Sequence, residues 1–241
     1  MDIVVFISCT LALTFGCFIQ SLVGFGMGVV AAPIILWIDP SLVPTVILIM
    51  GIIMSLIVMF QYRKYLCLSD LSFAYLGRLP GTFLASYMLI LLTEADMFIL
   101  LGVFILIAVF LSIYKFNVRA TPSTLFIGGL ISGVMGTATG IGGPPVALLF
   151  QNEEPNKLRA NLSAFFVITG LISLAALHYA GHFSVDEFTR VIWLVPIPLL
   201  GVYAAYLIRN KVDKKIIKGM ILILCSISAV VSLIQGIHLS L

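Results

Sequence analysis

The residues best suited to bind a ligand form a glycine- and proline-rich run at residues 140–145 (GIGGPP). Proline disfavours a helical conformation in the residue before it, which applies here to Gly143 and Pro144. Pro145 can occupy the first position of a helix, where its missing N–H costs nothing, so we expect a helix to begin there. Converging N–H groups at a helix start and in a glycine-rich turn suit an oxyanion.

The candidate binding residues are therefore Gly140, Ile141, Gly142, Gly143, Pro144 and Pro145, with further N–H donors at Val146 and Ala147 and hydroxyl donors at Thr137 and Thr139. Glycines also allow close helix packing, but packing does not require two prolines.

A second candidate is Arg78, which lies inside a long apolar run beside Leu79-Pro80-Gly81. A cation in a run of this kind is costly to bury and is therefore a functional candidate. Its guanidinium can hold an oxyanion through two parallel hydrogen bonds. The alternative is that the long side chain extends to the nearer polar end of the run.

The composition identifies the surroundings in which these residues must act. Of the 241 residues, 61% are hydrophobic and only 10% are charged, and the mean hydropathy is +1.21. An average soluble domain has about 25% charged residues, so lipid must solvate most of this surface. No basic cluster is interleaved with aromatic residues, which argues against nucleic acid as a partner. We expect an all-α, multi-pass protein of the cell membrane.

Apolar runs define the expected spans, because a helix needs about 20 apolar residues to cross a bilayer. Two longer stretches, 3–38 and 123–151, are each interrupted by a glycine-rich motif and would form either one broken span or a hairpin. The single spans are expected at residues 42–61, 71–92, 97–114, 160–180, 190–208 and 219–238.

The distribution of positive charge favours hairpins, because cytoplasmic loops of membrane proteins are enriched in Lys and Arg. With two hairpins, the ratio of inside to outside cations is 11:1, and Arg190 is the one outside. With two single crossings, the ratio falls to 7:5. The hairpin arrangement is therefore expected, and it places both termini outside the cytoplasm. The cations that it places inside are Arg63, Lys64, Lys115, Arg119, Lys157, Arg159, Arg209, Lys211, Lys214, Lys215 and Lys218.

The two interrupted stretches also resemble each other. Residues 24–31 (GFGMGVVA) align with residues 140–147 (GIGGPPVA) at an offset of 116, with four of eight positions identical. Each stretch precedes three single spans, and Ala85-Ser86-Tyr87 recurs as Ala204-Ala205-Tyr206. Residues 24–31, the first motif, lack the proline pair of residues 140–147, the second motif. The first motif adds Gln20, Ser21, Gly24, Phe25 and Gly26 to the candidate binding residues.

A hairpin followed by three crossings reverses the orientation of the second half of the chain. The sequence therefore predicts two inverted-topology repeats, residues 1–118 and 119–241, each a broken or re-entrant hairpin followed by three transmembrane helices. Irregular backbone at membrane depth must line a cavity or be buried in protein. If both turns meet near the middle of the membrane, they form one binding site at the repeat interface.

Three motifs in the chain resemble the sulfite exporter TauE/SafE family. They are residues 136–149 (GTATGIGGPPVALL), the earlier echo at 20–26 (QSLVGFG), and Leu79-Pro80-Gly81. The resemblance covers essentially the whole chain and implies a transporter of small sulfur-containing anions such as sulfite or an organosulfonate. Arg78 and both motifs would then contact the anion.

The leading hypothesis is a secondary transporter, an exporter working by alternating access. A channel-like anion pore and, third, a membrane enzyme are the alternatives. No paired carboxylates or other catalytic constellation supports an enzyme. The four cysteines have no metal-ligand spacing, so neither metal nor cofactor is expected. The expected partners are the small anion and the lipid bilayer, and a homo-oligomer stays open. Asn161 and Ser163 begin an expected span, where they could cap the helix or line a path.

Overall fold

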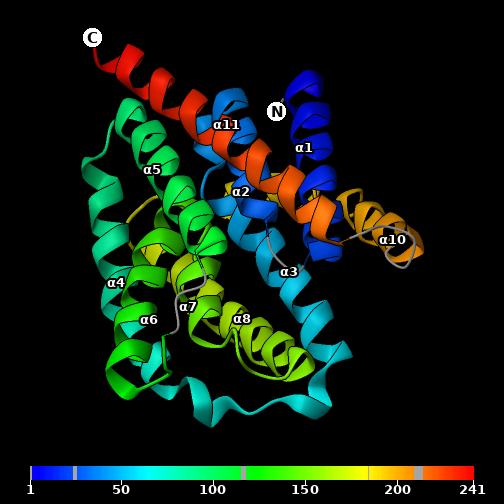
Figure 1. Ribbon diagram of the computed structural model, residues 1–241. Helices are drawn as coiled ribbons and strands as arrows, with labels where there is room; N and C mark the ends of the chain where they lie inside the picture. Colours follow the sequence, from blue (N-terminus) through cyan, green and yellow to red (C-terminus); the bar gives the residue numbers. More distant parts are fainter. Residues whose placement is uncertain (1, 24–25, 115–117, 184, 209–213) are drawn as a thin grey trace. The chain divides into compact units, whose positions relative to one another are not determined.

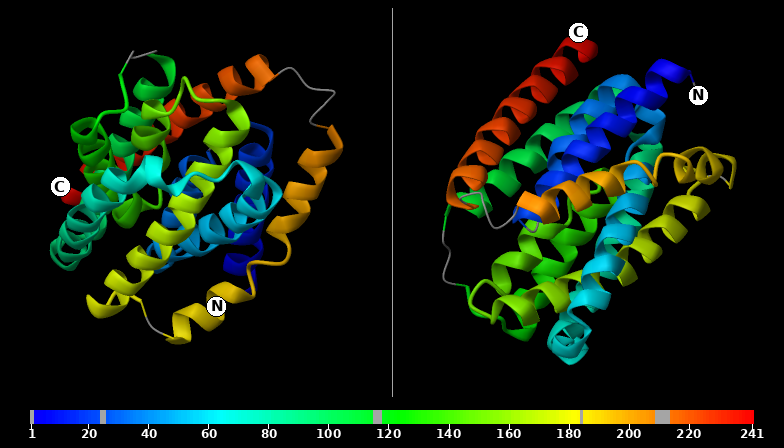
Figure 2. Two further views of the ribbon diagram at one scale, coloured as in Figure 1. Left: turned by 90° about the horizontal axis from the view of Figure 1, so that it is seen from below. Right: turned by 90° about the vertical axis from the view of Figure 1, so that its right-hand side faces the viewer.

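The chain is helical throughout the part that the computed structural model describes, residues 2–23, 26–114, 118–183, 185–208 and 214–241, with no strand there (Figures 1 and 2). Four helices in this part are long and apolar enough to cross a membrane. They are α1 (Ile3–Val23), α5 (Glu94–Ile113), α8 (Pro155–Tyr179) and the Leu222–Ser240 part of α11 (Lys214–Ser240). The prediction of an all-α chain with membrane-length apolar helices is confirmed for this part.

The remaining elements are shorter or less apolar. The α-helices are α2 (Met27–Ile38), α3 (Thr45–Gln61), α4 (Ser72–Leu91), α6 (Pro122–Thr139), α7 (Gly143–Leu149), α9 (Val185–Ile192) and α10 (Pro198–Ile208). Short 3-10 turns occupy Pro40–Leu42, Arg63–Tyr65 and Leu68–Leu71.

Both long stretches are interrupted at their glycine-rich motifs. Gly140 ends α6 with a φ of 78°, and Gly26 precedes α2 with a φ of 116°. Positive φ values of this size are costly for residues with a Cβ, so glycine suits both turns. The motif glycines therefore break the helices where the sequence predicts a break.

One predicted span is wrong as a single helix. Residues 190–208 contain the end of α9 at Ile192, a stretch of turns, and the start of α10 at Pro198. Pro196 and Pro198 explain the break, because each lacks an N–H and disfavours helix in the residue before it.

The start of α8 also differs from the prediction. The helix begins at Pro155, where the Glu154 carboxylate accepts hydrogen bonds from the N–H groups of Asn156 and Lys157, both at 3.2 Å. Asn161 and Ser163 are consequently inside the helix, and neither caps it.

The helices form two compact units, each drawing on both halves of the chain. Unit 1 comprises Met1–Ile47, Leu92–Val109 and Ser184–Leu241, and unit 2 comprises Leu48–Leu91 and Phe110–Phe183. In unit 1, α1 packs against α2 and α10; in unit 2, α4 packs along α6, and α7 and α8 join them. These units do not coincide with the predicted halves 1–118 and 119–241, which stay a prediction.

The α4–α6 pair in unit 2 is packed through glycines. A Cβ on Gly77 would overlap the carbonyl oxygen of Phe126, and one on Gly129 would overlap that of Ala74. A Cβ on Gly133 would lie 2.7 Å from the carbonyl oxygen of Arg78. Small residues allow this close approach of two backbones. As a result, Arg78 lies directly against α6.

Candidate functional site

Arg78 is buried in unit 2, and the side chain is only 3% exposed. Its Nη1 atom donates to the carbonyl oxygen of Ser132 at 2.5 Å and to the hydroxyl of Ser132 at 2.6 Å. Its Nη2 atom donates to the Ser173 hydroxyl at 3.4 Å, a long bond. Nε has no partner among the described residues. The guanidinium therefore does not extend to the polar end of α4.

Two glycines, Gly136 in α6 and Gly142 in the turn after it, lie against this guanidinium. A Cβ on Gly136 would lie 2.6 Å from Nη2 and 2.8 Å from Nη1, and a Cβ on Gly142 would lie 2.6 Å from Nη1. Real Cβ atoms do not approach other atoms this closely, so the guanidinium fills the space that the two missing side chains leave. Arg78 and the second motif are two separate candidates in the sequence, and in the structure they form one site.

Buried hydroxyls extend the site. Ser132 donates to the carbonyl oxygen of Gly142 at 2.5 Å. The hydroxyls of Thr137 and Ser173 lie 2.8 Å apart, and Thr137 donates to Thr82 at 3.2 Å. All four hydroxyl residues are fully buried. Such a network can hold or orient a polar ligand next to the guanidinium.

No carboxylate within the described residues forms an ion pair with Arg78. The two ion pairs there join Lys157 to Asp70 and to Glu153. The neighbours of the guanidinium are instead neutral oxygens and the Phe165 ring, whose centroid is 5.8 Å from Cζ. A buried charge without a counter-charge costs several kcal/mol, and an anionic ligand would relieve that cost.

The predicted start of α7 at Pro145 is wrong by two residues. The helix begins at Gly143, with Gly142 as its N-cap and the two prolines in its first turn. Gly143 has no Cβ, which removes part of the clash that disfavours helix before proline, and prolines in a first turn lose no helical hydrogen bond. The N–H groups of Val146 and Ala147 then point into the helix toward residues 142 and 143, so they are not donors to the turn.

The predicted donors at Ile141 and Thr139 are engaged locally. The N–H of Ile141 donates to the Thr139 hydroxyl at 3.4 Å, and that hydroxyl donates to the carbonyl of Met135 at 2.7 Å. Gly140 forms the left-handed turn, and Pro144 and Pro145 carry no N–H. Among the predicted residues, Arg78, Thr137 and Gly142 are brought together.

The predicted residues of the first motif lie in unit 1. The side-chain oxygen of Gln20 accepts a hydrogen bond from the N–H of Met27 at 3.2 Å, which bridges the turn before α2. Ser21 donates to the carbonyl of Cys17 at 2.8 Å. Gly26 supplies the positive φ noted above, and Gly24 and Phe25 lie outside the described residues. A single site shared by both motifs stays a prediction.

Sequence reasoning missed Ser132, Ser173, Thr82 and Phe165. Thr82 could have been found, because it lies four residues after Arg78 on one helix face. The other three come from α6 and α8, far along the chain. The signal of the two serines in the sequence is weak, since isolated serines in apolar helices usually bond to their own backbone.

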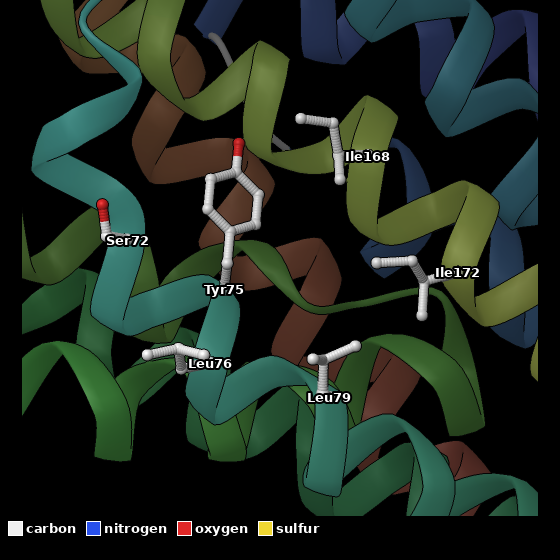
Figure 3. Close-up of a pocket in the computed structure, with 6 residues that line it drawn as sticks. All are labelled: Ser72, Tyr75, Leu76, Leu79, Ile168 and Ile172. Atoms are coloured by element: carbon white, nitrogen blue, oxygen red, sulfur yellow. The ribbon is translucent and has the colours of Figure 1, made fainter.

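An apolar crevice of about 380 Å³ lies beside the site, between α4 and α8 (Figure 3). Figure 3 shows the Tyr75 ring extending from α4 toward α8, with isoleucines of α8 opposite. The crevice is lined by Ser72, Tyr75, Leu76, Leu79, Ile168 and Ile172.

An all-helical chain with apolar membrane-length helices and a buried, unpaired cation is typical of a polytopic membrane transporter. The family model of the sulfite exporter TauE/SafE matches residues 9–232. The chain therefore belongs to the sulfite exporter TauE/SafE family, which confirms the resemblance noted in the sequence and identifies a membrane transporter. This membership agrees with the expectation that the chain is not an enzyme. No curated protein and no solved structure matches the chain.

Proposed function

We propose that this chain exports a small sulfur-containing oxyanion, such as sulfite or an organosulfonate, and that the anion binds to Arg78. The observation that carries the proposal is the buried guanidinium, which has only neutral partners within the described residues and an unpartnered Nε. Family membership supports the sulfur-containing class of substrate.

The hydrogen bonds of Arg78 leave one edge of the guanidinium open. Nη1 is occupied by both oxygens of Ser132, whereas Nη2 has a single long bond and Nε has none. Nε and Nη2 can donate two parallel hydrogen bonds to two oxygens of one anion. The Ser173 hydroxyl, which accepts from Nη2, lies next to this edge and can turn its proton from Thr137 toward the anion. Planar, bidentate recognition of this kind suits the oxygens of sulfite or a sulfonate.

Matching helix contacts in the two units support an inverted repeat. In unit 2, Gly81 of α4 packs against the carbonyl oxygen of Leu130 in α6. In unit 1, Gly201 of α10 packs in the same way against the carbonyl oxygen of Thr14 in α1. Thr14 and Leu130 are related by the same offset of 116 residues as the two motifs. Each unit thus pairs the motif hairpin of one half with the second single span of the other half.

An inverted repeat supports alternating access, because the two halves can exchange conformations and open the site to either side. We therefore infer a secondary transporter in which binding at Arg78 precedes a change of conformation. The two equivalent parts would be the two halves of the chain, each a hairpin followed by three spans.

The test is equilibrium binding of sulfite to the purified protein and to three variants. Arg78→Lys keeps the charge but loses the bidentate geometry, so we expect sulfite affinity to fall about tenfold, or roughly 1.4 kcal/mol. Arg78→Gln also removes the charge and should abolish measurable binding. Arg159→Gln is the matched control, because Arg159 is exposed and lies over the Tyr62 ring. Unchanged sulfite affinity in both Arg78 variants would contradict the proposal.

A further inference from the structure

Two more side-chain donors, on α4 and α8, lack a partner within the described residues. They are Nδ2 of Asn161, a residue only 1% exposed, and the hydroxyl of Tyr75, whose oxygen is buried. Buried polar atoms in folded proteins are nearly always hydrogen-bonded, so unpartnered ones require an explanation. Together with Nε of Arg78, helices α4 and α8 therefore hold three buried donors without an acceptor.

The orientation of the Asn161 amide is fixed. Its Oδ1 atom accepts a hydrogen bond from the backbone N–H of Cys67 at 2.8 Å. Only the oxygen of the amide can accept from an N–H, so the free atom is the NH2 group, a donor. The Tyr75 hydroxyl can likewise turn its proton toward an acceptor. Both groups suit an anion and would not attract a cation.

The two donors lie on one side of Arg78. Tyr75 is one turn before Arg78 on α4, and Asn161 is one turn before Phe165 on α8. The Phe165 ring contacts both residues of α4: its centroid is 5.1 Å from that of Tyr75 and 5.8 Å from Cζ of Arg78. Phe165 therefore separates the Arg78 site from the donors one turn away.

The starts of α4 and α8 meet at the same end of unit 2. Asp70, just before α4, forms an ion pair of 2.8 Å with Lys157 in the first turn of α8. Arg159 lies at this end as well, and it donates to the Tyr62 hydroxyl at 2.9 Å. Asn161 and Tyr75 lie nearer to this charged end than Arg78 does, each about one turn closer along its helix. Along α4 and α8, the donors therefore lie in order from the charged end to the buried cation.

We propose that Tyr75 and Asn161 form a second anion station, through which the transported oxyanion passes between the charged end of unit 2 and Arg78. This inference rests on the proposed function, because the same anion occupies both positions. Both donors are neutral, so the station binds the anion more weakly than Arg78 and releases it readily. A transport path needs such weak positions, since an anion that is held tightly at every step would not move.

Two variants remove the donors with little change of shape. Tyr75→Phe deletes only the hydroxyl. Asn161→Asp keeps an oxygen to accept from Cys67 and replaces the free donor by a second oxygen. Tyr87→Phe is the control on α4, because Tyr87 is 63% exposed. Thr169→Val is the control on α8, because Thr169 is buried and bonds only to the backbone carbonyl of Phe165.

The experiment compares the flux of radiolabelled sulfite in proteoliposomes with equilibrium sulfite binding. We expect each station variant to lower the flux about tenfold, the effect of losing one hydrogen bond to a charged group. Sulfite affinity, which is dominated by Arg78, should change much less, and both controls should transport normally. A merely structural role would lower thermal stability and binding together with flux.

Two outcomes separate this proposal from the preceding one. If Arg78→Gln loses sulfite binding while Tyr75→Phe and Asn161→Asp both transport at the unaltered rate, the second station is wrong and the Arg78 site stands. If the unaltered protein binds neither sulfite nor sulfoacetate, the proposed function fails, and the station fails with it.

Discussion

Arg78 and Ser132 are 54 residues apart in the chain, yet both oxygens of Ser132 accept hydrogen bonds from one nitrogen of Arg78. The same serine hydroxyl donates to the carbonyl of Gly142. Ser132 therefore couples the buried cation of α4 to the glycine-rich turn after α6. Ser132 thus helps to fix the position of the open edge of Arg78.

Replacing Ser132 with alanine should weaken this coupling. We expect Ser132→Ala to reduce the free energy of unfolding by about 1–3 kcal/mol, because the Gly142 carbonyl loses a buried hydrogen bond. Sulfite affinity should fall as well, since Nη1 retains only the backbone oxygen. Thermal unfolding and sulfite binding measure the two effects. Ser163→Ala is the control, because the buried Ser163 hydroxyl bonds only to the carbonyl of Ala160; equal effects of the two variants would contradict the role of Ser132.

Two adjacent glycines should differ sharply in their tolerance of a methyl group. A Cβ on Gly142 would lie 2.6 Å from Nη1 of Arg78, whereas one on Gly143 would meet Phe166 at an ordinary 3.5 Å. Gly142→Ala should thus displace the guanidinium, cost about 1–3 kcal/mol of stability and abolish sulfite binding. Gly143→Ala should keep binding nearly intact. Equal binding by both variants would show that Gly142 does not fix Arg78.

The predicted topology can be tested by cysteine labelling from one side of the membrane. We expect Lys115→Cys and Asn156→Cys to react from the cytoplasmic side, because the hairpin prediction places both loops there. The background variant should carry Cys67→Ser, since Cys67 is the half-exposed thiol and the other three are buried. Labelling of the two positions from opposite faces would rule out the hairpin at 123–151.

The ion pair between Asp70 and Lys157 predicts a small dependence of stability on pH. Hydrogen bonding from the Lys157 ammonium lowers the pKa of the Asp70 carboxyl. The pair therefore stabilises the folded state above the pKa of an unfolded aspartate, about 3.9, and this stabilisation is lost as the pH falls through the lower folded pKa. The effect should be small because both side chains are partly exposed. Asp70→Asn should lower the melting temperature slightly at neutral pH and remove this acid dependence; an unchanged profile would contradict the prediction.

The sequence predicted the site only in part. Arg78 was found because a cation is unusual in an apolar run, and Gly142 because the motif required a turn. Ser132 and Ser173 were not found, because their bonds to Arg78 span 54 and 95 residues and depend on the packing of α6 and α8. The single span predicted at 190–208 failed because two prolines outweighed the apolar composition. The start of α7 was misplaced because a glycine before proline lacks the Cβ that causes part of the clash.

The glycine packing of α4 against α6 has a mechanical consequence. Backbone atoms of the two helices are in direct contact, so neither can slide or rotate on the other without a collision. Arg78, Ser132 and the turn at Gly142 must then move as one rigid body. The longest hydrogen bond of Arg78, 3.4 Å, joins this body to Ser173 of α8. The start of α8 is held to the segment before α4 by the Asp70–Lys157 ion pair, so we expect the part of α8 around Ser173 to move when the cation becomes accessible.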